Sequence, residues 1–159
     1  MDKIFQTSDD IVELAEDVFD STGLPQVGIN LKVMSVTKSK DVLKVTKANA
    51  TTEFSTNKKD MDTLYVYEEA FDRLTDEQKN KLMEGVLSNI SYDSEKDKLN
   101  IDNSRYGEAI RMRRKYPNYV DIIETSIMVI EEIQEEEAQK KEEERERKAA
   151  ERAARKGGK

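Results

Sequence analysis

Residues 74–93, LTDEQKNKLMEGVLSNISYD, contain the clearest helix signal in the chain. Thr75 suits an N-cap, and Gln78 three residues later completes the capping-box pattern, in which each side chain bonds the other's backbone N–H. Two acidic residues follow the cap, where they suit the positive end of the helix dipole. The pattern predicts a helix over residues 75–91, and the rest of the fold can be worked out around it.

Two residues of this segment do not suit a helix. Apolar residues at four-residue spacing mark its buried stripe: Leu82, Val86 and Ile90. Gly85 and Asn89, also four residues apart, share another face, although glycine inside a helix costs about 1 kcal/mol relative to alanine and asparagine is also unfavourable. Either another element packs closely there, or the two positions mark a site that once held other side chains.

The composition excludes several classes of active site. The chain has 159 residues, the length of about one domain, with 38% charged and 6% aromatic residues. It has no cysteine and no histidine, which excludes disulfides, cysteine nucleophiles, zinc sites built on those residues and histidine bases. We expect an intracellular, soluble protein, since no apolar run is long enough for a membrane span and no secretory signal stands at the start.

The remaining segments predict an α+β fold. Residues 8–22 predict a helix that Ser8 caps and Gly23 with Pro25 ends. Residues 27–37 and 41–54 alternate like strands, and TKSKD between them is short enough for a hairpin. Residues 63–67 predict a third strand, and 98–102 a short strand or an extended loop. We expect a small, mostly antiparallel sheet packed with the N-terminal helix, the 75–91 helix and a long C-terminal helix.

The C-terminal helix is expected to change character at residue 134. It begins near Pro117, and its apolar stripe is Ile123, Ile127, Ile130 and Ile133. We therefore expect a globular domain over 1–133 and a solvent-exposed charged helix over 134–159. Acid-first pairs at four-residue spacing favour that helix: Glu136–Lys140, Glu137–Lys141, Glu143–Arg147, Glu144–Lys148 and Glu151–Arg155.

The charge of this tail is polarised. Residues 134–146 hold seven acids and three bases, and residues 147–159 hold one acid and six bases. Either the charges simply complement the helix dipole, or the tail is a contact arm whose basic tip meets nucleic acid or an acidic protein surface. The candidate tip residues are Arg147, Lys148, Arg152, Arg155 and Lys156. The tail lacks the a/d seam of a coiled coil.

Residues 65–90, YVYEEAFDRLTDEQKNKLMEGVLSNI, resemble the phage putative metallopeptidase family, a zincin-like group with a similar strand, acidic turn and helix start before an HExxH motif. On this resemblance, which covers residues 25–133, Gly85 falls on the first histidine, Val86 on the glutamate and Asn89 on the second histidine. Tyr116 is the expected counterpart of the third ligand. The resemblance therefore implies a zincin-like pseudoenzyme without metal, cofactor or catalytic residues, because the imidazoles and the base are all replaced.

Two further clusters of charged residues are candidate binding sites. The carboxylates of residues 91–102 lack the central glycine of a calcium loop and predict a solvated loop. Residues 105–119 mix basic and aromatic side chains that can bind a protein or a nucleic-acid strand, or else pair with the acidic body and pack internally. The candidates are Arg105, Tyr106, Arg111, Arg113, Arg114, Lys115, Tyr116 and Tyr119.

The resemblance, together with the lack of cysteine and histidine, favours a non-catalytic phage-type binding protein, and the phage origin rests on the resemblance alone. The expected partner is a host protein, a phage enzyme or a virion component, and the expected location is the host cytoplasm or the virion, with no membrane contact. The alternative is a nucleic-acid accessory protein that uses residues 105–119 and the tail tip, although residues 1–133 carry a balance of −8, which opposes phosphate binding. A residual hydrolase is a third reading that would require bound metal.

Overall fold

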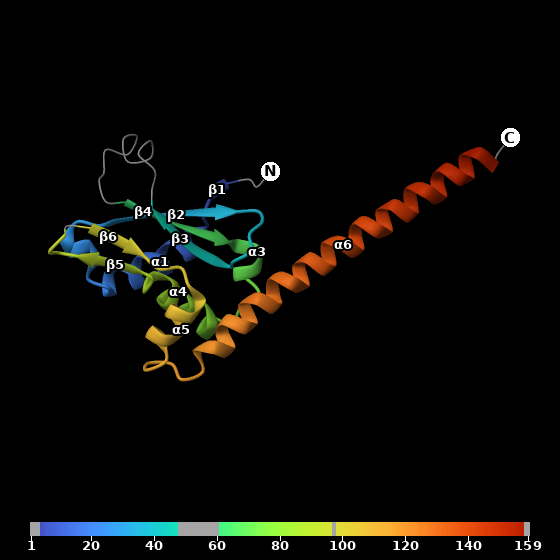
Figure 1. The fold of residues 1–159 in the computed structure, drawn as a ribbon. Helices are drawn as coiled ribbons and strands as arrows, with labels where there is room; N and C mark the ends of the chain where they lie inside the picture. Colours follow the sequence, from blue (N-terminus) through green and yellow to red (C-terminus); the bar gives the residue numbers. More distant parts are fainter. Residues whose placement is uncertain (1–3, 48–60, 97, 158–159) are drawn as a thin grey trace.

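The computed structural model describes residues 4–47, 61–96 and 98–157, and it is an α+β structure (Figure 1). The main sheet has the order β1-β2-β4-β3. Its strands are β1 (Ile4–Gln6), β2 (Asn30–Val36), β4 (Met61–Tyr67) and β3 (Leu43–Lys47). A second, two-stranded sheet pairs β5 (Ile90–Asp93) with β6 (Lys98–Ile101).

The main sheet is mixed, because β2 and β4 run parallel while the β1–β2 and β3–β4 pairs are antiparallel. The predicted hairpin between residues 27–37 and 41–54 is therefore wrong. These segments contain β2 and β3, and β4 lies between the two strands and pairs with both. Side chains on both faces of β4 are buried, including Thr63, Leu64, Val66 and Tyr67. β4 is the central strand because β2 and β3 pair with its two edges, and side chains buried on both faces are typical of such a strand. The predicted strand residues 48–54 lie outside the described part.

The helices are α1 (Asp9–Ser21), the 3-10 turn η1 (Leu24–Val27), α3 (Glu68–Phe71), α4 (Asp76–Leu87), α5 (Arg105–Met112) and α6 (Tyr119–Gly157). α1 and α4 pack against each other and against the main sheet, α1 at β2 and α4 at β3. The first helix ends as expected, with Gly23 in the left-handed conformation at a φ of 80°. The core between these layers includes Leu64, Phe71, Met83, Leu87 and Ile133.

The predicted start of α4 is confirmed and its predicted end is wrong. Thr75 and Gln78 form both bonds of the capping box, at 3.2 Å and 2.9 Å. The helix ends at Leu87, and Ser88 caps it, so Ile90 is not the last member of the helical stripe but the first residue of β5. The helix closes with a tight turn in which the Asn89 N–H donates to the Val86 carbonyl oxygen at 3.1 Å. The following residues, 90–93, favour a strand and pair with β6.

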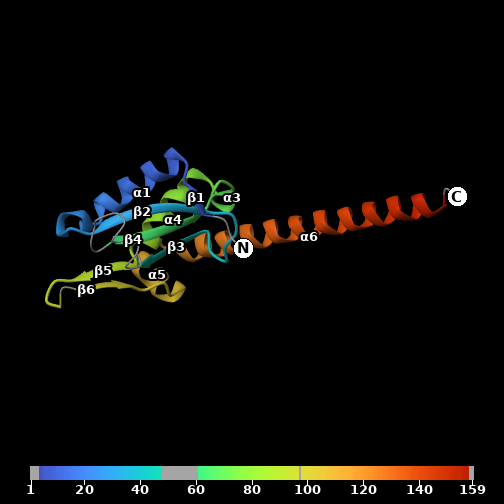
Figure 2. The ribbon, with the colours of Figure 1, turned by 90° about the horizontal axis from the view of Figure 1, so that it is seen from above.

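α6 is one helix of 39 residues that packs on the body at its start and then projects from it in both views (Figures 1 and 2). Its buried stripe is rotated from the predicted one: Tyr119, Ile122, Val129, Ile130 and Ile133 are buried, whereas Ile123 and Ile127 are only partly buried. Arg73 binds Glu136 with two bonds of 3.0 Å and 2.7 Å where the helix leaves the body. Residues 138–157, called the arm below, are exposed throughout.

The ion pairs of α6 only partly follow the expected spacing. Glu144 and Lys148 pair at 2.6 Å as predicted, but Arg147 approaches Glu151, at 3.9 Å, rather than Glu143. Glu136 pairs with Arg73 instead of Lys140, because a bidentate arginine contact is stronger than a lysine contact in the same exposed setting.

None of the helices in the described residues has both the length and the apolar character needed to cross a bilayer.

Candidate functional site at the junction of α4, α5 and α6

Gly85 lies directly beneath the ring of Tyr119, the first residue of α6. A Cβ atom placed on Gly85 would be 1.8 Å from the Tyr119 hydroxyl oxygen and 2.3 Å from its ring carbon Cζ. No side chain larger than hydrogen fits at this position while the phenol stays in place. Close packing therefore explains the glycine at position 85. The ring of Tyr119, at the start of α6, occupies the space that a larger side chain on α4 would need.

The Tyr119 hydroxyl reaches a buried carboxylate on α5. It donates to Glu108 Oε2 at 2.7 Å, and Asn89 Nδ2 donates to Glu108 Oε1 at 3.0 Å. Glu108 is only 7% exposed, Asn89 4% and Tyr119 1%. Two donors thus offset part of the cost of removing this carboxylate from water. The second unusual residue of the α4 segment, Asn89, is therefore also explained by a contact.

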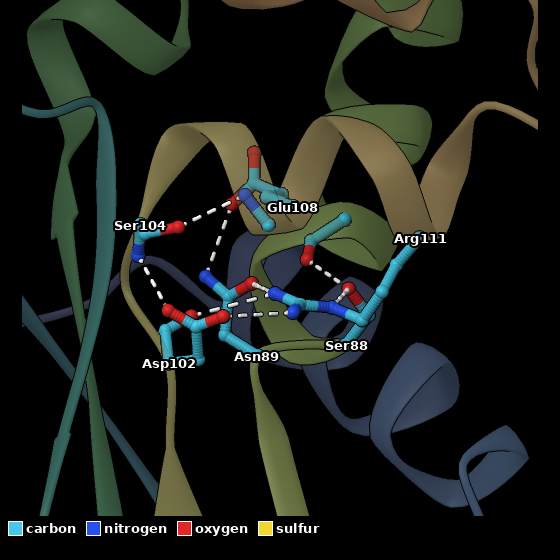
Figure 3. A network of polar contacts seen from close by, with 8 residues as sticks. Ser88, Asn89, Asp102, Ser104, Glu108 and Arg111 are labelled. Atoms are coloured by element: carbon cyan, nitrogen blue, oxygen red, sulfur yellow. Dashed lines mark hydrogen bonds and ion pairs between the residues drawn. The ribbon is translucent and has the colours of Figure 1, made fainter.

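Arg111 extends this network towards the surface (Figure 3). Its guanidinium donates to the Asn89 side-chain oxygen and, at 3.0 Å, to Asp102 Oδ2. The backbone N–H of Ser104 and the Arg111 guanidinium both donate to Asp102, and they lower the pKa of its carboxyl group. Ser104 also caps α5, since its hydroxyl accepts from the Gly107 N–H at 2.9 Å. The polar groups at the junction are therefore bound mainly to one another.

Burial dominates the electrostatics of the Glu108–Tyr119 pair. Desolvation raises the pKa of Glu108, against the lowering effects of Tyr119, Asn89 and Arg111. The pKa of Tyr119 is also raised, by burial first and then by the nearby Glu108 charge. The phenol consequently remains a hydrogen-bond donor at neutral pH.

A cavity of about 60 Å³ lies beside Glu108, between β3, α4, α5 and α6. Glu108 and Asn89 line one part, the Asp41–Arg105 ion pair of 2.9 Å lines another, and isoleucines of α6 complete the wall. Ligand sites for drug-sized molecules usually occupy roughly 300–1,000 Å³, and a water molecule needs only about 10–15 Å³. The cavity therefore suits a few water molecules.

Of the four degenerate positions, the structure brings Gly85, Val86 and Asn89 to this junction but not Tyr116. Val86 and Asn89 line the cavity, and Tyr119 rather than Tyr116 is the tyrosine that joins them. The Tyr116 hydroxyl instead donates to Glu84 Oε2 at 2.7 Å. No group of three side chains suited to hold a metal ion occurs among the residues that the structure describes.

The Arg/Tyr candidates divide into two sets. Arg105 pairs with Asp41, Arg111 with Asp102, and Lys115 with Glu84, so their charges are met within the chain. Tyr116 and Tyr119 bond carboxylates as described above. The outward set is Tyr106, Arg113 and Arg114, all exposed. Of the candidates on the arm, Arg147 and Lys148 have acidic neighbours on the helix, while Arg152, Arg155 and Lys156 are exposed and form no ion pair within the described residues.

Glu108 and Ile110 were not among the sequence candidates, and Asp102 was predicted only as a carboxylate of a solvated loop. A signal for Glu108 existed, because it is an acid in a basic segment and lies four residues before Met112. The pair shares the buried face of α5. No local pattern indicated that Asp102 would reach Arg111. Ile110 is the apolar residue on the opposite, outer face of the same helix, where it is 52% exposed.

Comparisons of the chain with protein-family models, with curated proteins and with solved structures found no match.

The contact at Gly85 is tested by replacing it with alanine. We expect Gly85→Ala to lower the free energy of unfolding by about 1–3 kcal/mol, the range for overpacking a core. Gly157→Ala is the matched control, because a Cβ there meets nothing within 4 Å, and it should change stability by less than about 0.5 kcal/mol. Urea denaturation measures both. Equal stability of the two variants would contradict the Tyr119 packing.

The raised pKa of Glu108 predicts how the free energy of unfolding depends on pH. The folded protein binds this proton more tightly than the unfolded chain, so ionisation of Glu108 lowers the free energy of unfolding as pH rises from its ordinary pKa of 4.5 through the folded value. Glu108→Gln removes this loss, and the variant should gain stability relative to the native protein between pH 4 and pH 8. Denaturation curves across this range measure the difference. A stability difference between Glu108→Gln and the native protein that does not change with pH would contradict the prediction.

Proposed function

We propose that this chain is a non-catalytic protein that works by binding a protein partner, with the arm as part of its contact surface. The single observation that carries the proposal is the arm itself, residues 138–157, which extends roughly 30 Å at 1.5 Å per residue and is exposed along its whole length. A helix that is polar all round has no core of its own to join, and such helices bridge between bodies.

The junction of α4, α5 and α6 supports the non-catalytic part of the proposal. Asn89 and Tyr119 both donate to Glu108, and all three residues are buried. This arrangement suits a structural role in holding the three helices together. A general acid or base must instead reach a substrate proton. The resemblance to zincin-like phage proteins belongs to the same proposal. It would make the chain a phage pseudoenzyme that acts in the host cytoplasm or in the virion.

The arm's part in binding is tested by capture from host lysate, with and without infection and after nuclease treatment. Full-length protein should retain a protein partner, and a chain that ends at Glu137 should retain at least tenfold less. This truncation keeps the Arg73–Glu136 contact, and its thermal unfolding should match that of the full chain. Undiminished capture by the shortened chain would remove the arm from the contact surface, and no capture by either would contradict the proposal.

The second candidate function is nucleic-acid binding by the arm tip, favoured by the exposed bases Arg152, Arg155 and Lys156. It predicts an affinity for duplex DNA that falls steeply as salt rises. Replacing these three residues with glutamine should weaken binding and flatten the salt slope by about three. Replacing Lys140, Lys141 and Arg145 is the control with the same charge change. Fluorescence anisotropy measures both, and absent or salt-insensitive binding would exclude this function.

A further inference from the structure

The four exposed side chains Tyr106, Ile110, Arg113 and Arg114 lie on α5, its C-cap and the turn that follows. The first three follow the spacing i, i+4, i+7, which places them along one side of a helix, because Arg113 has helical backbone angles as the C-cap residue. Arg114 is the next residue, in the turn. Tyr106 is 79% exposed and Ile110 52%. This set is called the outer face of α5 below. It lies opposite the buried residues Glu108 and Met112.

The two arginines of the outer face differ from the basic residues around them. Arg105, Arg111 and Lys115 each pair with a carboxylate at 3.0 Å or less. Arg113 and Arg114 form no ion pair within the described residues, although residues 1–133 carry eight more acids than bases. A body with so many carboxylates leaves these two guanidinium groups without an ion pair in the described residues, one helical turn from the exposed side chain of Ile110.

Arginine and tyrosine are the residue types that most often anchor protein interfaces, with apolar neighbours that exclude water around them. Two free guanidinium groups can each bind a carboxylate in bidentate geometry. The Tyr106 ring and the Ile110 side chain supply apolar area beside them. The outer face is therefore complementary to a segment that offers carboxylates and apolar side chains together.

We infer that the outer face of α5 docks an acidic amphipathic segment of the protein partner, an inference that rests on the proposed function. The charge of the body opposes nucleic acid here, and Ile110 offers nothing to a phosphate backbone. The acidic part of a second copy's arm fits less well, because Ala138 is the only apolar residue between Glu135 and Glu146. The docked segment places acids at Arg113 and Arg114 and a leucine or an aromatic residue against Tyr106 and Ile110.

The inference is tested by selecting binders from a yeast-displayed library of random 16-residue peptides with the full-length protein. The selected peptides should be acidic and should contain leucine or aromatic residues. Arg113→Glu combined with Arg114→Glu should weaken their binding at least tenfold. Lys96→Glu combined with Lys98→Glu makes the same charge change at two exposed positions of the β5–β6 hairpin and should change binding less than twofold. Ile110→Ser should weaken binding, whereas Met128→Ser, at a position 56% exposed on α6, should not.

Several results would overturn the inference. They are the absence of any enriched peptide, enriched peptides without acidic residues, and binding that survives the Arg113 and Arg114 changes. Competition by single-stranded DNA that depends on the same arginines would assign the face to nucleic acid. Self-association in light scattering that these changes abolish would assign it to a second copy. Lysate capture of a protein partner that the double variant leaves intact would keep the proposed function and remove only this inference.

Discussion

The phenol of Tyr119 joins three helices in one contact, and the arrangement of the C-terminal half depends on it. The ring lies on Gly85 of α4, and its hydroxyl donates to Glu108 of α5 while its backbone begins α6. Because the contact leaves no space for a Cβ on Gly85 and the phenol donates to Glu108 Oε2 at 2.7 Å, the start of α6 is determined by both shape and hydrogen bonding. A buried carboxylate that lost one of its two donors would carry an uncompensated desolvation cost.

This contact also explains why the Arg/Tyr segment divides into an inner and an outer set. With Glu108 and Met112 turned towards the core, helical geometry places Arg111 over Asn89 and Asp102. The same geometry turns Tyr106, Ile110 and Arg113 away from the core. Pairing with carboxylates of the body therefore accounts for Arg105, Arg111 and Lys115, and the arginines of the outer set are those that form no ion pair within the described residues. The surface proposed for binding is thus smaller and more apolar than the sequence alone indicated.

The features that could be predicted from the sequence are those encoded by neighbouring residues. The capping box of Thr75 and Gln78, the glycine stop at Gly23 and the polar arm all depend on interactions within a few residues. The position of β4 between β2 and β3 depends on pairing with β2 across 31 residues and with β3 across 15 to 23 residues, which alternation of apolar residues does not encode. Gly85 was recognised as unusual, but its reason lies 34 residues away at Tyr119. Glu108 was missed because a buried acid resembles an exposed one until its donors are known. The zincin-like assignment remains a prediction.

The continuity of α6 has a mechanical consequence. Its 39 residues span roughly 58 Å at 1.5 Å per residue, and no break separates the segment held by Tyr119 from the basic tip. The helix is held to the body at Tyr119 and again at Glu136, which binds Arg73. Only the arm beyond these contacts can swing as a lever, over roughly 30 Å at 1.5 Å per residue. A tilt of about 10° where the arm leaves the body would move its basic tip by roughly 5 Å.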